Sequence, residues 1–194
     1  MSARSGMSEL IGLFRNGVAD TGTVYFTDDR AQQILDARRL DFWQDPLTPV
    51  TAQIAVGSVE YKVYFSRYNY LEGTASGSTC FRLYDGNGTA IATGYTFDAV
   101  NGRFDFTANQ MGSARYVDGR SYDLNGAIAD GWREMAGLQS GAYDFRVEGR
   151  SYSRSQWFEH CKSMAEYFDN KSSGGRGTFN RDAVGTIERG DMTC

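Results

Sequence analysis

The chain has 194 residues, of which 41% are hydrophobic and 14% aromatic, enough for one ordinary domain or two small ones. Its formal net charge of −4 gives no basic surface for nucleic acid. Three cysteines (Cys80, Cys161 and Cys194) exclude a four-cysteine zinc site and a disulfide scaffold, so we expect reduced thiols. No stretch has the pattern of a signal peptide or a membrane span, and we expect a soluble protein made inside the cell.

Residues 1–26 are interpreted as an N-terminal arm, because their short apolar patch is interrupted by glycines. A first helix is expected after this arm. Thr27 is a good N-cap, and the two aspartates that follow it suit the positive end of the helix dipole. The helix cannot extend beyond Asp45, because Pro46 follows. Residues 27–45 are therefore assigned to a helical core.

The hydrophobic period then changes from helical to two, which predicts strands over the segment 46–120. Gly and Asn cluster at 85–88 as a turn, and the Asn-Gly pair at 101–102 is the strongest hairpin signal in the chain. After that pair, Phe104 and Phe106 fall on one face of a strand. We expect an inserted antiparallel β domain of four or five strands.

Residues 121–170 contain two amphipathic helical patterns joined by a short polar loop. The predicted fold class is α+β, a small helical bundle of three main helices with an inserted antiparallel β-sheet domain and an extended C-terminal tail. Apolar residues spaced three or four apart are expected to hold the last two helices together as a hairpin. This predicted hairpin core consists of Leu124, Ile128, Trp132, Met135, Trp157, Cys161, Met164 and Phe168.

The segment 171–194 begins with a Ser/Gly-rich hinge and continues with scattered apolar and charged residues. It is too short to fold alone and too apolar to serve only as a solvated tail. We therefore predict a docking tail that gains a partner on a portal protein or a neighbouring subunit. The residues expected to make this contact are Phe179, Arg181, Val184, Ile187, Arg189 and Met192.

Catalytic or metal-binding patterns do not emerge. His160 and Cys161 are adjacent in a predicted helix, where neighbouring side chains point about 100° apart, so a Cys/His nucleophile is not expected. We expect no enzyme activity, metal or cofactor. Six tyrosines of the β segment leave open a second interpretation, a glycan- or receptor-binding tail module. These are Tyr61, Tyr64, Tyr68, Tyr70, Tyr84 and Tyr95.

Several segments, taken in order, resemble the head–tail connector (adaptor) proteins of tailed double-stranded-DNA bacteriophages. The resemblance extends from about Thr27 to Phe168, and its most specific part is the helical pair with the linker between its helices. The segments that carry it read FTDDRAQQILDARRLDFW, LYDGNGT, YTFDAVNGRFDFTANQ, GRSYDLNGAIADGWREMAG, YDFRVEGRSYSRSQ and CKSMAEYF.

The resemblance implies a structural virion protein at the head–tail interface, assembled in the host cytoplasm. Copies are expected to form a ring, commonly of twelve, beneath the portal protein, to bind further tail or connector proteins, and to extend the DNA channel. Genomic DNA would pass through the lumen without sequence-specific binding, which agrees with the net charge of −4. No membrane contact is expected.

Overall fold

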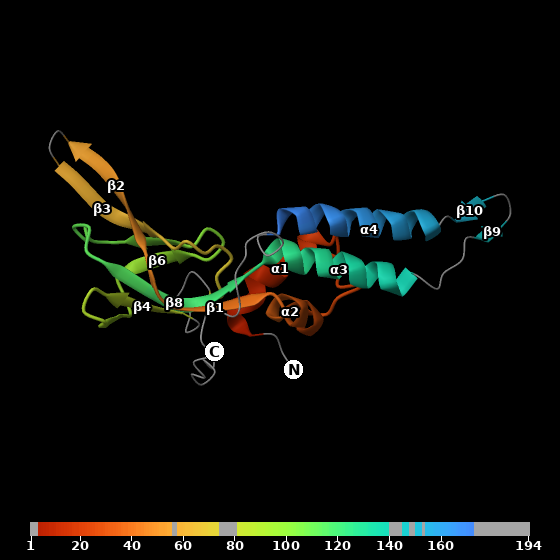
Figure 1. Ribbon diagram of the computed structural model, residues 1–194, viewed down its shortest axis with the longest axis horizontal. Helices are drawn as coiled ribbons and strands as arrows, with labels where there is room; N and C mark the ends of the chain where they lie inside the picture. Colours follow the sequence, from red (N-terminus) through yellow and green to blue (C-terminus); the bar gives the residue numbers. More distant parts are fainter. Residues whose placement is uncertain are drawn as a thin grey trace. The chain divides into compact units, whose positions relative to one another are not determined.

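The computed structural model describes residues 4–55, 58–73, 81–139, 145–147, 150–152 and 154–172 (Figure 1). The helices are η1 (Ser5–Met7), α1 (Ser8–Gly17), α2 (Asp28–Asp36), α3 (Leu124–Gln139) and α4 (Arg154–Lys171). The strands are β1 (Arg39–Pro46), β2 (Thr48–Ala55), β3 (Ser58–Phe65), β4 (Arg82–Asp85), β5 (Ala90–Ile91), β6 (Tyr95–Asp98), β7 (Arg103–Phe106), β8 (Arg115–Tyr122), β9 (Phe145–Val147) and β10 (Arg150–Tyr152).

These elements divide into two compact units, each described here by itself. The β unit contains the described residues of 4–10 and 39–122, and the helical unit contains 11–38 and the described residues from 123 to 172. The division crosses α1 between Leu10 and Ile11.

The predicted fold class, a small bundle of three main helices with one inserted sheet, is wrong. The described residues form four α-helices and two four-stranded antiparallel sheets, with strand orders β1-β8-β4-β5 and β2-β3-β7-β6. Residues 39–46, mostly assigned above to the helical core, form β1 and pair with β8, while α2 ends at Asp36. Pairing with a strand some 80 residues away in sequence overrides the local helical preference of these residues. A local sequence pattern does not reveal such a distant pairing.

The predicted N-terminal arm also differs, because it contains α1. Within the helical unit, α1 and α3 pack closely at two glycines. A Cβ added to Gly131 would lie 2.8 Å from Val18 Cγ1, and one added to Gly17 would lie 2.3 Å from Ile128 Cδ1. Gly17 and Gly131 are therefore positions at which α1 and α3 approach each other.

Several local predictions are confirmed. Thr27 is the N-cap of α2, and its side chain accepts a hydrogen bond from the Arg30 backbone N–H. Strands β6 and β7 form the hairpin signalled by the Asn-Gly pair, with Phe104 and Phe106 buried. The turn at 85–88 joins β4 to β5, and Asp85 Oδ1 accepts from the backbone N–H groups of Asn87 and Thr89.

The core of the β unit contains residues of both sheets. Phe104, which is fully buried, lies with its ring centroid 4.8 Å from that of Phe97 and 5.7 Å from that of Phe81. The buried residues of this core are Phe42, Leu47, Tyr64, Leu71, Phe81, Leu83, Phe97, Ala99, Phe104, Phe106 and Val117. The packing holds the two sheets together through aromatic contacts.

The β2–β3 hairpin extends beyond the rest of its sheet, as the orange strands of Figure 1 show. Strand β7 pairs with β3 only at Val63, Tyr64 and Phe65, whereas β2 pairs with β3 as far as Ala55. The Tyr61 backbone is held by the loop that follows β7, through hydrogen bonds to Asn109 and Gln110. We call residues 50–55 and 58–60 the β arm.

Candidate interaction surfaces

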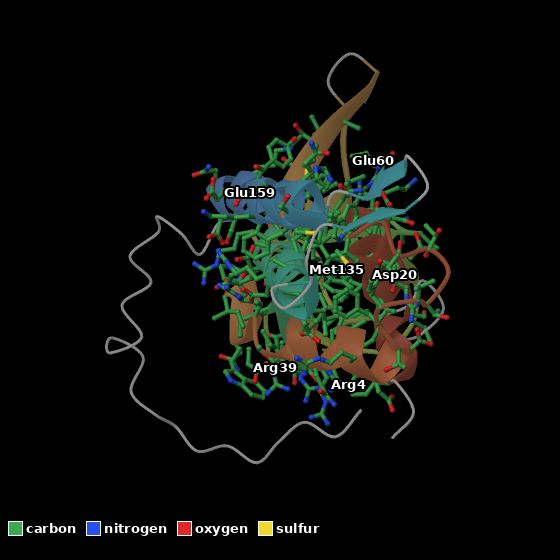
Figure 2. The ribbon with its side chains drawn as sticks, turned by 90° about the vertical axis from the view of Figure 1, so that its right-hand side faces the viewer. Arg4, Asp20, Arg39, Glu60, Met135 and Glu159 are labelled. Carbon is green, nitrogen blue, oxygen red and sulfur yellow. The ribbon has the colours of Figure 1, made fainter. Side chains whose placement is uncertain are left out.

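The α3–α4 hairpin is the segment with the most specific resemblance and is therefore the first candidate surface. The two helices run antiparallel, with Asn125 and Lys171 at one end and Gly137 and Phe158 at the other (Figure 1). Figure 2 shows Met135 inside this unit and Glu159 on the outer side of α4. Predicted hairpin-core residues that are buried are Leu124, Ile128, Trp132, Met135 and Cys161.

The remaining predicted core residues lie at the edge of this packing. Trp157 is 37% exposed, and Met164 and Phe168 are half-buried. Their spacing of seven and four residues puts all three on one side of α4. The α4 helix therefore buries a narrow stripe around Cys161 and Ala165, and leaves an apolar margin partly open to solvent.

Aromatic rings connect the buried stripe to this margin. The Trp132 and Trp157 ring centroids are 6.3 Å apart, and the His160 ring lies edge-on to Trp132 at 5.6 Å. Trp132 Nε1 donates a hydrogen bond of 3.1 Å to the Gly17 carbonyl, which fixes the indole between α3 and the end of α1. Trp157 thus exposes part of a large ring while packing against the Trp132 ring, which is held in place. This arrangement is typical of an interface anchor.

A chain of ion pairs ties three helical segments of this unit together. Arg38, just after α2, makes a two-point contact with Asp130 of α3 at 2.7 and 2.9 Å. Arg133 bridges Asp130 to Asp169 of α4. Burial raises the pKa of Asp130, but hydrogen bonds and charges from Arg38 and Arg133 outweigh it and leave the pKa below its ordinary value. These ion pairs therefore hold the three helical segments together.

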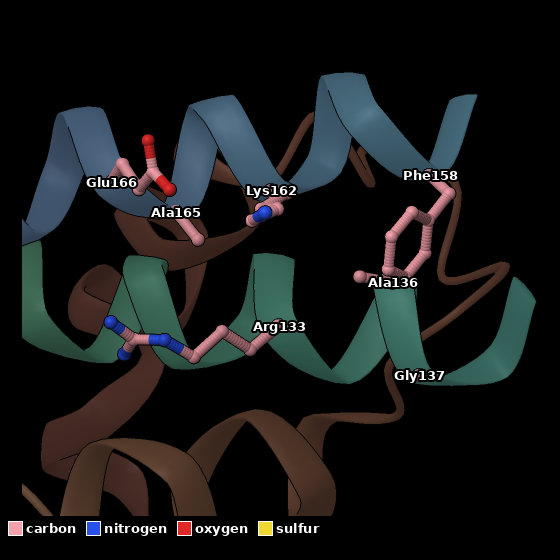
Figure 3. Close-up of a pocket in the computed structure, with 7 residues that line it drawn as sticks. All are labelled: Arg133, Ala136, Gly137, Phe158, Lys162, Ala165 and Glu166. Carbon is pink, nitrogen blue, oxygen red and sulfur yellow. The ribbon is translucent and has the colours of Figure 1, made fainter. Parts of the chain in front are cut away.

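A shallow pocket of about 360 Å³ lies between α3 and α4 (Figure 3). Its lining combines small residues with charged ends, and the residues are Arg133, Ala136, Gly137, Phe158, Lys162, Ala165 and Glu166. Arg133 is already paired with Asp130 and Asp169. The described lining residues include no Ser, Thr, Cys or His side chain, which are common nucleophiles and bases of catalytic sites.

A buried polar cluster in the β unit had no signal in the sequence. Glu72 is fully buried; its Oε1 accepts from Arg4 Nε at 2.8 Å and its Oε2 from the Tyr122 hydroxyl at 2.6 Å. Arg120 Nη1 lies 3.4 Å from Glu72 Oε2. Burial raises the pKa of Glu72, but hydrogen bonds from Arg4 and Tyr122 and the two arginine charges leave it below its ordinary value. The cluster fixes the segment before α1 to the end of β8.

The six tyrosines considered for glycan binding do not form an exposed platform. Tyr64 is fully buried and donates to the Ser113 carbonyl at 3.0 Å, and the other five are half-buried. Tyr68 stacks on Phe42 at 4.5 Å, and Tyr95 packs against Phe104 and Phe106. Sugar platforms need an accessible ring face, and these rings are used largely in packing.

The neighbouring His160 and Cys161 are not brought together as a catalytic pair. Cys161 is buried, and burial raises the pKa of its thiol, which disfavours the reactive thiolate. His160 is exposed and contacts aromatic rings. Among the described residues, no group of three or more His, Cys, Asp or Glu side chains is arranged to hold a metal ion.

The predicted docking-tail residues Phe179, Arg181, Val184, Ile187, Arg189 and Met192 lie outside the described residues. In the part of the chain that is described, no helix has the length and apolar character needed to cross a membrane. Comparison with known family models, curated proteins and solved structures found no match to this chain.

Proposed function

We propose that this chain is a structural virion protein of a tailed bacteriophage, a head–tail connector that forms a ring below the portal. In this role it extends the DNA channel and links the portal to further tail or connector proteins. DNA passes through the lumen without sequence-specific contacts. The proposal rests on the resemblance of several sequence segments, taken in order, between Thr27 and Phe168.

The observation that supports it best is the construction of the α3–α4 hairpin. Its polar residues Asp130, Arg133 and Asp169 hold helices together. The partly exposed ring of Trp157 packs against the buried Trp132 ring. Because these charged groups are paired within the unit, the partly exposed apolar margin is left as a surface for contact with a neighbouring copy. In a closed ring, each copy would present one surface to the preceding copy and another to the next.

Locating the protein in the virion tests the proposal directly. A gold-labelled antibody against the full chain should decorate the vertex between capsid and tail in electron micrographs of intact phage particles. Label over the tail fibres would instead support the receptor-binding interpretation. Label absent from the particle would overturn the virion assignment.

Portal binding tests the role of the tail. A chain that ends at Ser172 keeps the Ser172–Asp123 hydrogen bond, so the helical unit should remain folded. We expect this truncation to lose binding to the portal protein in a pull-down assay. A full-length variant with Phe179, Val184 and Ile187 changed to serine separates loss of apolar anchors from loss of length. Undiminished portal binding by both variants would contradict tail docking.

A further inference from the structure

We propose that the free edge of β2, residues 50–55, pairs antiparallel with the same edge of a second copy of the chain. The inference concerns self-association of the isolated protein and goes beyond the proposed function. It rests on the β arm, which extends beyond the sheet that supports its base (Figure 1).

In the part of the chain that the structure describes, the β arm is paired only within its own two strands. Among the described residues, no strand pairs with the outer side of β2. Thr48 through Ala52 are all exposed, and Val50 and Val59 expose 44% and 46% of their surface. A two-stranded hairpin that pairs with no further strand is marginal in water at best. A third strand along β2 would supply the missing backbone hydrogen bonds.

The four outer strands of the two larger sheets differ in how they are protected. Strand β1 has a bulge between Phe42 and Asp45, carries charged residues and ends at Pro46. Strand β5 has two residues, and β6 has four and ends in Asp98. Bulges, charges, proline and short length are the usual ways in which proteins prevent edge-to-edge pairing. These three outer strands are therefore protected.

Strand β2 is the exception. It has eight residues, and after Pro49 its sequence VTAQIA contains no charge and no proline. An exposed edge of this length and composition readily accepts another strand. The contrast with the other three outer strands marks β2 as an edge that the chain leaves available.

The uncharged stretch of β2 suits pairing with a second copy of the chain. Two copies of a protein with net charge −4 repel each other, and like charges directly opposite each other weaken a strand pair. A two-fold β2–β2 contact brings together only uncharged residues of positions 50–55. The same contact through β1 would bring together the charged residues of that strand, including Asp41. The paired area is small, so the dimer should be weak and concentration-dependent.

Sedimentation velocity on the full chain tests this pairing, because it follows association as the concentration rises through the micromolar range. Changing Thr51 and Gln53 together to lysine should weaken dimer formation about tenfold or more, because lysines then face lysines. Changing both residues to glutamate should have the same effect. An equimolar mixture of the two variants should associate again. Thr93→Lys, at an exposed loop position of the same unit, is the control and should associate like the unmodified chain.

Hydrogen exchange provides a second measurement that does not depend on any variant. Amides of residues 50–55 should become more protected as the concentration of the unmodified chain rises, while those of β6 should not change. A chain that stays monomeric with unprotected arm amides at every concentration would overturn the proposal. So would a lysine variant that dimerises as well as the unmodified chain, because the contact would then lie elsewhere. Neither result depends on whether the protein binds a portal.

Discussion

The two units hold themselves together in different ways. The β unit has a buried aromatic core and also contains a fully buried carboxylate, Glu72, which accepts hydrogen bonds from arginine and tyrosine. In the helical unit, α4 buries only a narrow stripe, and the ion pairs around Asp130 are partly exposed. Burial raises both the value of a contact and the penalty for breaking it. Substitutions should therefore be severe in the β unit and mild on α4.

The largest expected effect is at the centre of the β core. Phe104→Ala should destabilise the β unit by about 3–5 kcal/mol, because it removes a fully buried ring and leaves a cavity among Phe81 and Phe97. Hydrogen exchange in rising denaturant measures this loss separately for each unit. Met111→Ala is the control, because Met111 is 83% exposed and its loss should leave stability unchanged. Equal losses from the two substitutions would contradict the core assignment.

Next in size is the buried carboxylate. Glu72→Gln should destabilise the β unit by about 3 kcal/mol, because it leaves the charge of Arg120, which is only 4% exposed, without its buried counter-charge. Glu60→Gln removes a more exposed partner of Lys62 and should change stability by less than about 1 kcal/mol. Chemical denaturation of both variants gives the comparison. A Glu72→Gln effect as small as that of Glu60→Gln would show that the cluster contributes little.

The pH dependence follows from the same residue. The pKa of Glu72 in the folded protein lies below its ordinary value of 4.5. A lowered pKa contributes stability that is present above the ordinary value and is lost as the pH falls through the folded value. The unmodified β unit should therefore lose stability below about pH 4.5, and the gap to Glu72→Gln should narrow. A gap that stays constant between pH 7 and acid conditions would argue against this ionised cluster.

The smallest effects should lie in the helical unit. Asp130→Asn weakens the contacts with Arg38 and Arg133 and should destabilise this unit by about 1 kcal/mol. Asp169→Asn removes a single, more exposed partner of Arg133 and should change stability by less than about 0.5 kcal/mol. Thermal unfolding, monitored by hydrogen exchange of the helical unit, ranks the stability losses of the two variants. A larger effect at Asp169 would mean that α4 is held mainly by its surface charges.

The sequence predicted those features whose cause is local. The N-cap at Thr27, the turn at Asp85 and the β6–β7 hairpin depend on residues within a few positions of one another. The α3–α4 pair follows from the three- and four-residue spacing of its apolar side chains. These features do not require knowledge of the rest of the fold.

Features created by distant partners were missed. Strand β1 depends on pairing with β8, and α1 depends on fitting Gly17 and Gly131 into the packing with α3. The buried cluster combines Arg4, Glu72 and Tyr122, whose separation along the chain hides any motif. The partly exposed face of Trp157 was also not foreseeable, because helical spacing does not reveal how much of a stripe its neighbours cover.

One junction in the chain has a consequence for engineering. Asp123 donates its backbone N–H to the Arg38 carbonyl at 3.1 Å, and the adjacent residues Arg39 and Tyr122 are paired as the ends of β1 and β8. The 84-residue segment between Arg38 and Asp123 therefore leaves and re-enters the chain at almost the same place. A segment whose two ends lie side by side is suited to domain exchange. Another domain with neighbouring termini could replace the strands while Arg38 and Asp123 stay in place and the chain still continues into α3.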